Sequence, residues 1–177
     1  VWGGMVNPKL AVALTGRSGE ALEEYKKLML KLNNEVVAAA PDDLLINTHV
    51  CRGNYHSTFF SSGAYDSVAD LLFGEENVNA YYLEYDDERS GGFAPLAKVS
   101  GDKKVVLGLV TTKTPALENK ELVINRIHEA AKYVPLDRLY LSPQCGFASC
   151  EIGNKLTEEE QWAKLKLVKE IAEEVWG

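Results

Sequence analysis

The feature that most constrains the fold of this chain is a regular alternation of helical and strand patterns along its 177 residues. Helical segments repeat apolar residues at helical spacing, whereas strand segments are short runs rich in β-branched and aromatic residues. Such alternation is typical of βαβ units, whose consecutive strands lie parallel in one sheet. We therefore expect an α/β fold, with room for only a short helix between the second and third strands. Helices are expected at 18–39, 64–74, 119–134 and about 157–175, and strands at 43–51, 78–86, 103–113 and 137–146.

Two of the predicted helices carry recognisable start signals. Ser18 is a plausible N-cap of the first helix. Thr157 and Glu160 form a capping-box pattern before the last helix. The apolar stripe predicted for the first helix consists of Leu22, Tyr25, Met29, Leu32 and Val36.

Four strands are too few for a closed (β/α)8 barrel, and the chain has no linker, low-complexity tract or clear repeat. We interpret residues 1–177 as a single domain that corresponds to half of such a TIM barrel, with four parallel strands and flanking helices. In these barrels the reactive groups gather where the strands end and the following loops begin. The strand ends are therefore the places to search for chemistry.

Composition excludes several classes of partner. The net charge of −7 argues against nucleic acid, since phosphate binding requires a basic face. No apolar run approaches the length of a membrane span, and the first residues lack the features of a signal peptide. The three cysteines are an odd number in a chain that is not cysteine-dense, so we expect reduced thiols and a cytoplasmic location.

Side chains able to bind a metal or transfer a proton occur at the predicted strand ends. His49 and Cys51 lie two positions apart, which places both side chains on one side of a strand. Glu84 ends the second strand, Lys113 the third and Cys145 the fourth. Each has an ordinary structural explanation alone, since buried cysteines are common. Because parallel strands bring their ends to one rim, the imidazole, thiols and carboxylate together favour a zinc site.

Four segments at these strand ends resemble one known family. "THVCRGN", "YYLEYDDERSG", "LGLVTTKTPALE" and "LSPQCGF" are similar, in the right order, to the C-terminal catalytic barrel of cobalamin-independent methionine synthase. They are most similar to the short single-barrel relatives of that enzyme. The resemblance implies the C-terminal half of a barrel and a zinc ion held by His49, Cys51, Glu84 and Cys145. Asp86 remains an alternative to Glu84, because the spacing to Arg89 favours it.

The resemblance also implies a reaction. Zinc would bind the sulfur of a thiol such as homocysteine as a thiolate, and this thiolate would accept a methyl group to form methionine. The implied protein is a zinc-dependent methyltransferase of methionine biosynthesis. The methyl donor stays open among a folate, a simpler methyl-sulfur compound and a corrinoid-borne methyl group.

Two departures from the family pattern affect this expectation. Lys113 occupies the position at which family members carry a histidine thought to aid proton transfer, so we assign it a catalytic role by position alone. The acidic residue that holds the homocysteine amino group in the family lies on a strand that would precede Val1. We therefore expect a fragment of a longer chain. A missing N-terminal half-barrel or a second copy would cover its open sheet edges.

Three further residues are candidates for binding the substrate. Arg52 and Arg89 could form a clamp for a carboxylate. His56 could reach into the mouth of the site, although a loop hydrogen bond is the simpler explanation for it.

A second class of function stays open. The chain could be a truncated or non-catalytic domain that keeps a structural zinc and acts through association with a partner half. Uroporphyrinogen decarboxylase relatives share the barrel but do not need the four ligands, which argues against that family. A catalytic zinc changes its ligand shell when a thiol is added, whereas a structural zinc does not.

Overall fold

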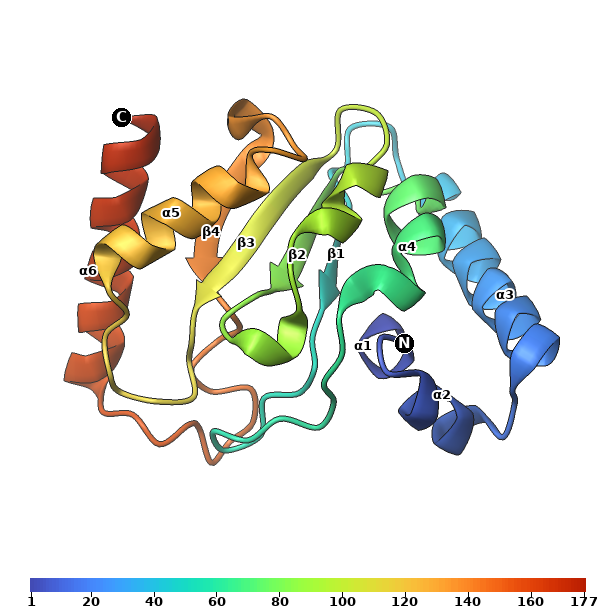
Figure 1. Ribbon diagram of the computed structural model, residues 1–177, viewed down its shortest axis with the longest axis horizontal. Coiled ribbons are helices and arrows are strands. Elements are labelled where there is room, and N and C mark those ends of the chain that lie inside the picture. The colour runs from blue at the N-terminus through green and yellow to red at the C-terminus, as the bar shows by residue number, and fades with distance from the viewer.

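A computed structural model describes residues 1–177 and contains one parallel sheet with helices beside it (Figure 1). The strands follow chain order, and each pairs in parallel with the next. The predicted α/β fold, with four parallel strands and flanking helices, is therefore confirmed. The strands are β1 Asn47–Val50, β2 Ala80–Glu84, β3 Lys104–Val110 and β4 Leu139–Pro143.

The helices flank the sheet, with α3 at one end of the row of strands and α6 at the other (Figure 1). The predicted capping box is confirmed, since Thr157 and Glu160 exchange side chain-to-backbone hydrogen bonds at the start of α6. No helix is both long and apolar enough to cross a membrane. The helices are α1 Trp2–Met5, α2 Pro8–Thr15, α3 Gly19–Ala38, α4 Ala69–Glu75, α5 Lys120–Ala130 and α6 Glu158–Trp176. Short 3-10 helices lie at Tyr65–Ser67, Glu88–Ser90, Ala94–Lys98 and Leu136–Arg138.

Helices α1 and α2 precede every element predicted from the sequence. Asn7 caps α2 by accepting a hydrogen bond from the backbone N–H of Leu10 at 3.1 Å, and Pro8 occupies the first helical position. Trp2 of α1 is buried and donates through Nε1 to Glu76 Oε1 at 3.1 Å. This bond fastens the N-terminal segment to the region after α4.

Strand β1 is shorter than predicted. The apolar run Leu44–Ile46 was expected to belong to it, but the strand begins at Asn47 and both leucines are exposed. The strand lies at the edge of the sheet and has only β2 as a partner. Directly before β1, the backbone N–H of Ile46 donates to Asn79 Oδ1. This side chain replaces the backbone acceptor that a paired strand would supply.

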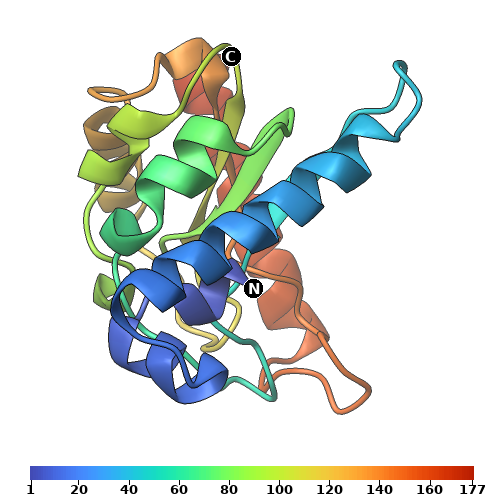
Figure 2. The same cartoon turned by 90° about the vertical axis from the view of Figure 1, so that its right-hand side faces the viewer.

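The apolar stripe predicted for α3 is correct only at its beginning. Leu22 is buried, but the next buried positions are Lys26 and Leu30, and Val36 is 74% exposed. The Lys26 ammonium donates to the backbone oxygen of Ser67 at 3.0 Å, so this face of α3 packs beside α4. Figure 2 shows the C-terminal part of α3 projecting beyond the body of the molecule, which leaves the rest of the stripe uncovered.

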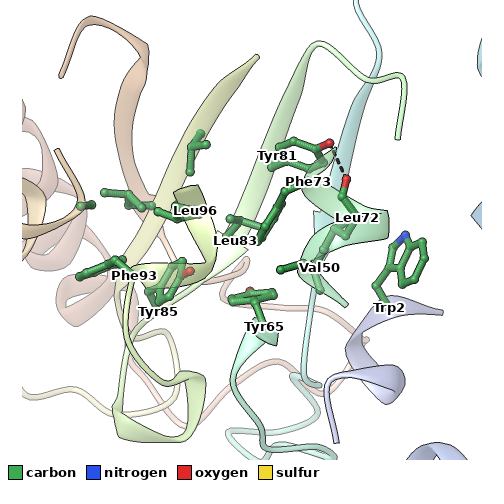
Figure 3. Close-up of a cluster of buried hydrophobic side chains, with 14 of the residues drawn as sticks. Trp2, Val50, Tyr65, Leu72, Phe73, Tyr81, Leu83, Tyr85, Phe93 and Leu96 are labelled. Atoms are coloured by element: carbon green, nitrogen blue, oxygen red, sulfur yellow. Dashed lines mark hydrogen bonds between the residues drawn. The ribbon is translucent and has the colours of Figure 1, made fainter. Parts of the chain in front are cut away.

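The core lies between the sheet and the helices (Figure 3). Tyr81 and Leu83 on β2 point into it, and the Tyr81 hydroxyl donates to the Leu72 backbone oxygen at 2.6 Å. Buried aromatic rings, among them those of Tyr65 and Phe73 with centroids 5.6 Å apart, fill the space under the helices. The long apolar run predicted for the third strand matches β3, which is buried from Val105 to Val110.

The opposite face of the sheet is more open. Side chains alternate along a strand, so Tyr82 points away from the core and is 40% exposed. Tyr140 on β4 is 41% exposed. This open face continues towards the strand ends that carry the predicted ligands.

A matched pair of substitutions on α5 tests the assignment of the core. Ile127 is fully buried, whereas Leu122 on the same helix is 63% exposed. We expect Ile127→Ala to lower the free energy of unfolding by about 2–5 kcal/mol, because it leaves a cavity. Leu122→Ala should change it by only about 0.5 kcal/mol. Urea denaturation followed by circular dichroism measures both, and equal losses would contradict the packing of α5 against the sheet.

Candidate metal centre

Three predicted ligands meet at the C-terminal end of the sheet. His49 lies on β1, Cys51 follows that strand directly, and Cys145 comes two residues after β4. The two sulfur atoms are 3.4 Å apart, and His49 Nε2 is 3.3 Å from Cys145 Sγ. One nitrogen and two sulfurs lie within 4.8 Å of one another. The structure thus brings together residues that are more than 90 positions apart in the sequence.

This meeting requires an explanation, because β1 and β4 are the two edge strands of the sheet. Three strand spacings separate them by roughly 14 Å. The chain after β4 closes this gap by turning inward over β3 at Gly108. A Cβ at that position would lie 2.9 Å from Gln144 Cα and 2.8 Å from the Leu83 oxygen. Only glycine admits so close an approach, and it lets Cys145 reach the β1 side.

Two asparagines hold the loops that carry the thiols. Asn54 donates to the Gly146 oxygen at 2.8 Å, directly beside Cys145. Asn154 donates to Asn54 Oδ1 at 2.9 Å and to the Thr112 oxygen at 2.6 Å. The loops after β1, β3 and β4 are therefore joined by side-chain amides. Figure 1 shows the first and last of these loops running side by side below the strand ends.

The contact between the two thiols shifts their pKa values in opposite directions. The hydrogen bond with Cys145 lowers the pKa of Cys51 to about 4, and the backbone N–H of Gly53, 3.2 Å from the sulfur, also favours its thiolate. The same hydrogen bond, with burial, raises the pKa of the Cys145 thiol above its ordinary value. The pKa of His49 is raised, chiefly by its hydrogen bond to Cys51. The contact between the two sulfurs therefore favours the thiolate form of Cys51 and the neutral form of Cys145.

Glu84 lies outside the group of three close donors, and its carboxylate is bonded on both oxygens. Oε1 accepts both Nε and Nη2 of Arg89, the latter at 2.7 Å. Oε2 accepts the backbone N–H of Arg52 at 2.9 Å and the side-chain amide of Gln144 at 2.8 Å. The last two residues are the immediate chain neighbours of the two cysteines. The alternative ligand Asp86 is also paired with Arg89, at 2.9 Å.

Lys113 is buried beside this network. Its ammonium donates to Gln144 Oε1 at 2.6 Å and lies 3.8 Å from Asp86 Oδ2. Gln144 thus bridges Lys113 and Glu84 from the position just before Cys145. The ammonium also acts on Cys145, where it opposes the rise in the thiol pKa.

The three residues expected to bind substrate have other partners. The guanidinium of Arg52 is buried and donates to the oxygens of Gly63, Tyr65 and Glu84. Arg89 is saturated by three carboxylates, those of Glu84, Asp86 and Asp87. Both arginines hold the loops in place, and their role as a substrate clamp stays a prediction.

His56 makes the loop hydrogen bond that the sequence suggested as its simpler role. Its Nδ1 lies 3.0 Å from the Gly153 oxygen. The ring is therefore used to join two loops and does not line the cavity beside Cys145.

A cavity of about 430 Å³ opens beside Cys145 on the open face of the sheet. His49 and Tyr82 form one part of its wall, and the β4 segment up to Gly146 forms another. A small molecule placed there would contact the imidazole and the Cys145 sulfur directly.

Comparison with known proteins settles the family. A family model described as "Cobalamin-independent synthase, Catalytic domain" matches residues 20–174. The chain belongs to this family. The predicted relationship is thereby confirmed for most of the sequence.

Individual relatives extend the comparison. The uncharacterized protein YxjG of Bacillus subtilis is 54% identical over 159 residues, which make up 89% of this chain and 42% of that protein. A structure from Listeria monocytogenes, provisionally named a vitamin B12-independent methionine synthase, superposes with a TM-score of 0.70 and 40% identity. That match covers 99% of this chain and 46% of the other. The 5-methyltetrahydropteroyltriglutamate–homocysteine methyltransferase of Bacillus licheniformis is 25% identical, over 88% of this chain and 18% of that protein. The chain therefore spans less than half the length of these family members.

Gln144, Asn54 and Asn154 are site residues that the sequence patterns did not reveal. Gln144 lies inside the "SPQCG" segment that supports the family assignment. Its position next to Cys145 in that segment could have identified it as a site residue. The two asparagines are in loops without a periodic pattern, and their partners are 42 to 100 residues away. Only the folded chain reveals these contacts.

The thiolate assignment predicts a selective reaction in the metal-free protein. Brief treatment with iodoacetamide at pH 6 should alkylate Cys51 before Cys145 and Cys150, because the thiolate is the nucleophile and the pKa of Cys51 lies below this pH. Peptide mass spectrometry gives the order of labelling. Lowering the pH towards 4 should slow the reaction at Cys51 as its thiolate becomes protonated. Faster labelling of Cys150 would contradict the assignment.

The role of Glu84 can be tested by removing its charge. Glu84→Gln should lower the free energy of unfolding by about 3 kcal/mol, because it removes a buried charge paired with the Arg89 guanidinium and turns an amide donor towards groups that already donate. Asp70→Asn is a matched control, since Asp70 forms an exposed ion pair with Lys98 and should contribute far less to stability than a buried carboxylate. Chemical denaturation measures both. A loss at residue 84 no larger than at residue 70 would mean that the carboxylate does not organise the strand ends.

Proposed function

We propose that this chain is the catalytic part of a zinc-dependent methyltransferase that methylates the sulfur of a small thiol such as homocysteine, yielding methionine or a related thioether. The observation that carries the proposal is the cluster of His49, Cys51 and Cys145 beside an open cavity. Membership in the cobalamin-independent synthase family supports it.

The donor set fits zinc. Imidazole nitrogen and thiolate sulfur are ligands that zinc prefers, and three protein ligands with an open position are typical of catalytic sites. His49, Cys51 and Cys145 would hold the ion, and Glu84 is the proposed fourth ligand because it bonds to the neighbours of both cysteines. It would have to give up at least one present donor to do so. Zinc bound there would supply the chemistry of keeping a substrate thiol deprotonated near neutral pH.

The residues around the cluster have roles of their own in this proposal. Gln144 holds the Lys113 ammonium beside Cys145, where its positive charge balances the carboxylates of Glu84 and Asp86. We propose Lys113 as the group that exchanges a proton at the sulfur of the incoming thiol. Tyr82 and His49 would confine the substrate against the sheet.

The open face of the sheet supports a partner in this reaction. Tyr82 and Tyr140 are both about 40% exposed on the face that carries the cavity. A second half-barrel, or a second copy of this chain, would cover these rings and complete the substrate site. The methyl donor is proposed as a folate or another small methyl donor. The three free thiols favour the cytoplasm as the location.

A structural zinc in a non-catalytic domain is the second candidate function. A structural site is closed by four protein ligands, so this candidate requires Glu84 to exchange one of its four present donors for the metal. The two functions differ in how the metal responds to a thiol.

Zinc content and coordination test the proposal directly. We expect one zinc per native chain by elemental analysis, loss of most of it in Cys145→Ser, and an unchanged content in Cys150→Ser, because Cys150 is outside the cluster. X-ray absorption should show an additional sulfur neighbour when homocysteine is added. Zinc with an unchanged shell would favour the structural candidate, and absence of zinc from the native chain would refute both.

A further inference from the structure

Helix α6 carries a lysine that is completely buried. Lys164 is 0% exposed, although lysine is rarely buried without a partner for its charge. Its Nζ donates to the backbone oxygen of Ala116 at 2.7 Å and to both carboxylate oxygens of Glu118 at 3.1 Å. All these acceptors lie in the loop between β3 and α5, which passes beside α6 in Figure 1. Lys164 therefore fastens this loop to the helix.

Glu118 connects the two ends of this loop, residues 111–119. Its Oε1 also accepts the backbone N–H of Thr111, the first residue after β3, at 2.8 Å. Residues 114–117 between these ends are exposed. The loop is thus held at its two ends, and both attachments depend on the ion pair of Glu118 with Lys164.

Lys113 belongs to the first end of the loop. Its backbone N–H donates to Thr111 Oγ1 at 3.3 Å, and its ammonium donates to Gln144 Oε1 at 2.6 Å. The hydroxyl of Thr112 donates to the same oxygen of Gln144 at 3.3 Å. The ammonium can reach Gln144 only while the backbone keeps this path, and the Glu118 carboxylate holds the residue at which the path begins.

Stability alone does not require a charge at this place. Replacing a buried ion pair by apolar side chains of similar volume often leaves stability unchanged or raises it, because burial removes the hydration of both charges. An apolar residue at position 164 would pack as Leu167 and Ile171 do, which are buried on the same helix. It could not bond to the Ala116 oxygen or to the Glu118 carboxylate. The ion pair therefore adds a defined conformation of the loop.

We propose that Lys164 and Glu118 are positioning residues for Lys113: they hold the loop after β3 so that the Lys113 ammonium stays on Gln144, the residue before Cys145. Neither belongs to the cluster of ligands or to the wall of the cavity. The inference rests on the methyltransferase function proposed above for the use of Lys113. The position of its ammonium can be measured without that reaction.

Acetylation of lysine side chains by an N-hydroxysuccinimide ester, followed by peptide mass spectrometry, measures this position in the full chain. A buried and bonded ammonium reacts only when its surroundings open. Lys113 and Lys26 are 8% and 5% exposed, so both should react slowly in the native chain, whereas Lys166, with a side chain 77% exposed, should react fast. Equally fast reaction of Lys113 and Lys166 in the native chain would overturn the proposal.

The decisive variant replaces both partners, Lys164→Met together with Glu118→Gln, because it retains the side-chain volumes and leaves no buried charge unpaired. We expect Lys113 to react about tenfold faster in this variant, since the loop opens more often, while Lys26 stays slow. Lys26→Met is the matched control. It removes another buried lysine, bonded to the Ser67 oxygen at the opposite end of the sheet, and should leave Lys113 slow.

Unchanged reactivity of Lys113 in the double variant would overturn the proposal. Equal acceleration of Lys113 and Lys26 would also overturn it, because the ion pair would then hold the whole fold and not the loop in particular. Zinc content reports on the methyltransferase function separately, and the double variant should retain the zinc of the native chain because it alters none of the ligands. Lack of zinc in the native chain would refute the metal centre, while the labelling would still decide the position of Lys113.

Discussion

A carboxylate can be buried without water only where donors satisfy both of its oxygens, and in this chain that requirement shapes the end of the sheet. Glu84 takes its donors from the loop after β1, the loop after its own strand and the segment after β4. Through Gln144 it is also joined to Lys113, which follows β3. The four strand ends are thus held at fixed distances by one side chain. The positions of the two cysteines follow from this arrangement, since each lies next to a residue that bonds to Glu84.

Much of this could be predicted from the sequence, because it depends on local patterns. The order of helices and strands follows from hydrophobic periodicity. The pairing of His49 with Cys51 follows from the two-residue period of a strand. What could not be predicted depends on contacts between distant segments. The partners of Arg52 and Arg89 are set by how loops fold over the sheet. A sequence does not distinguish an exposed arginine that binds a substrate from a buried arginine that holds loops together. The buried face of α3 was likewise decided by its packing beside α4, with Lys26 in place of a hydrophobic residue.

The two faces of the sheet differ in burial and polarity. One face and the helices form the core, in which buried aromatic rings and β3 supply the apolar area (Figure 3). The other carries polar and half-exposed side chains that lead to the thiols. The relatives from Bacillus subtilis and Listeria monocytogenes are more than twice as long as this chain. The hydrophobic core and the cavity beside Cys145 therefore lie on opposite faces of the same four strands.

The distance of 3.4 Å between the sulfurs of Cys51 and Cys145 has a consequence for the chain as a polymer. These residues are 94 positions apart, so any bridge between the two sulfurs closes a loop that contains more than half of the protein. Closing a loop of this length removes conformational freedom from the unfolded chain equivalent to about 4–5 kcal/mol. A ligand that binds both sulfurs would therefore act as a reversible cross-link as well as a reactive group. Loss of that ligand would make the whole domain easier to unfold. The same ligand would therefore contribute both to the reaction and to the stability of the fold.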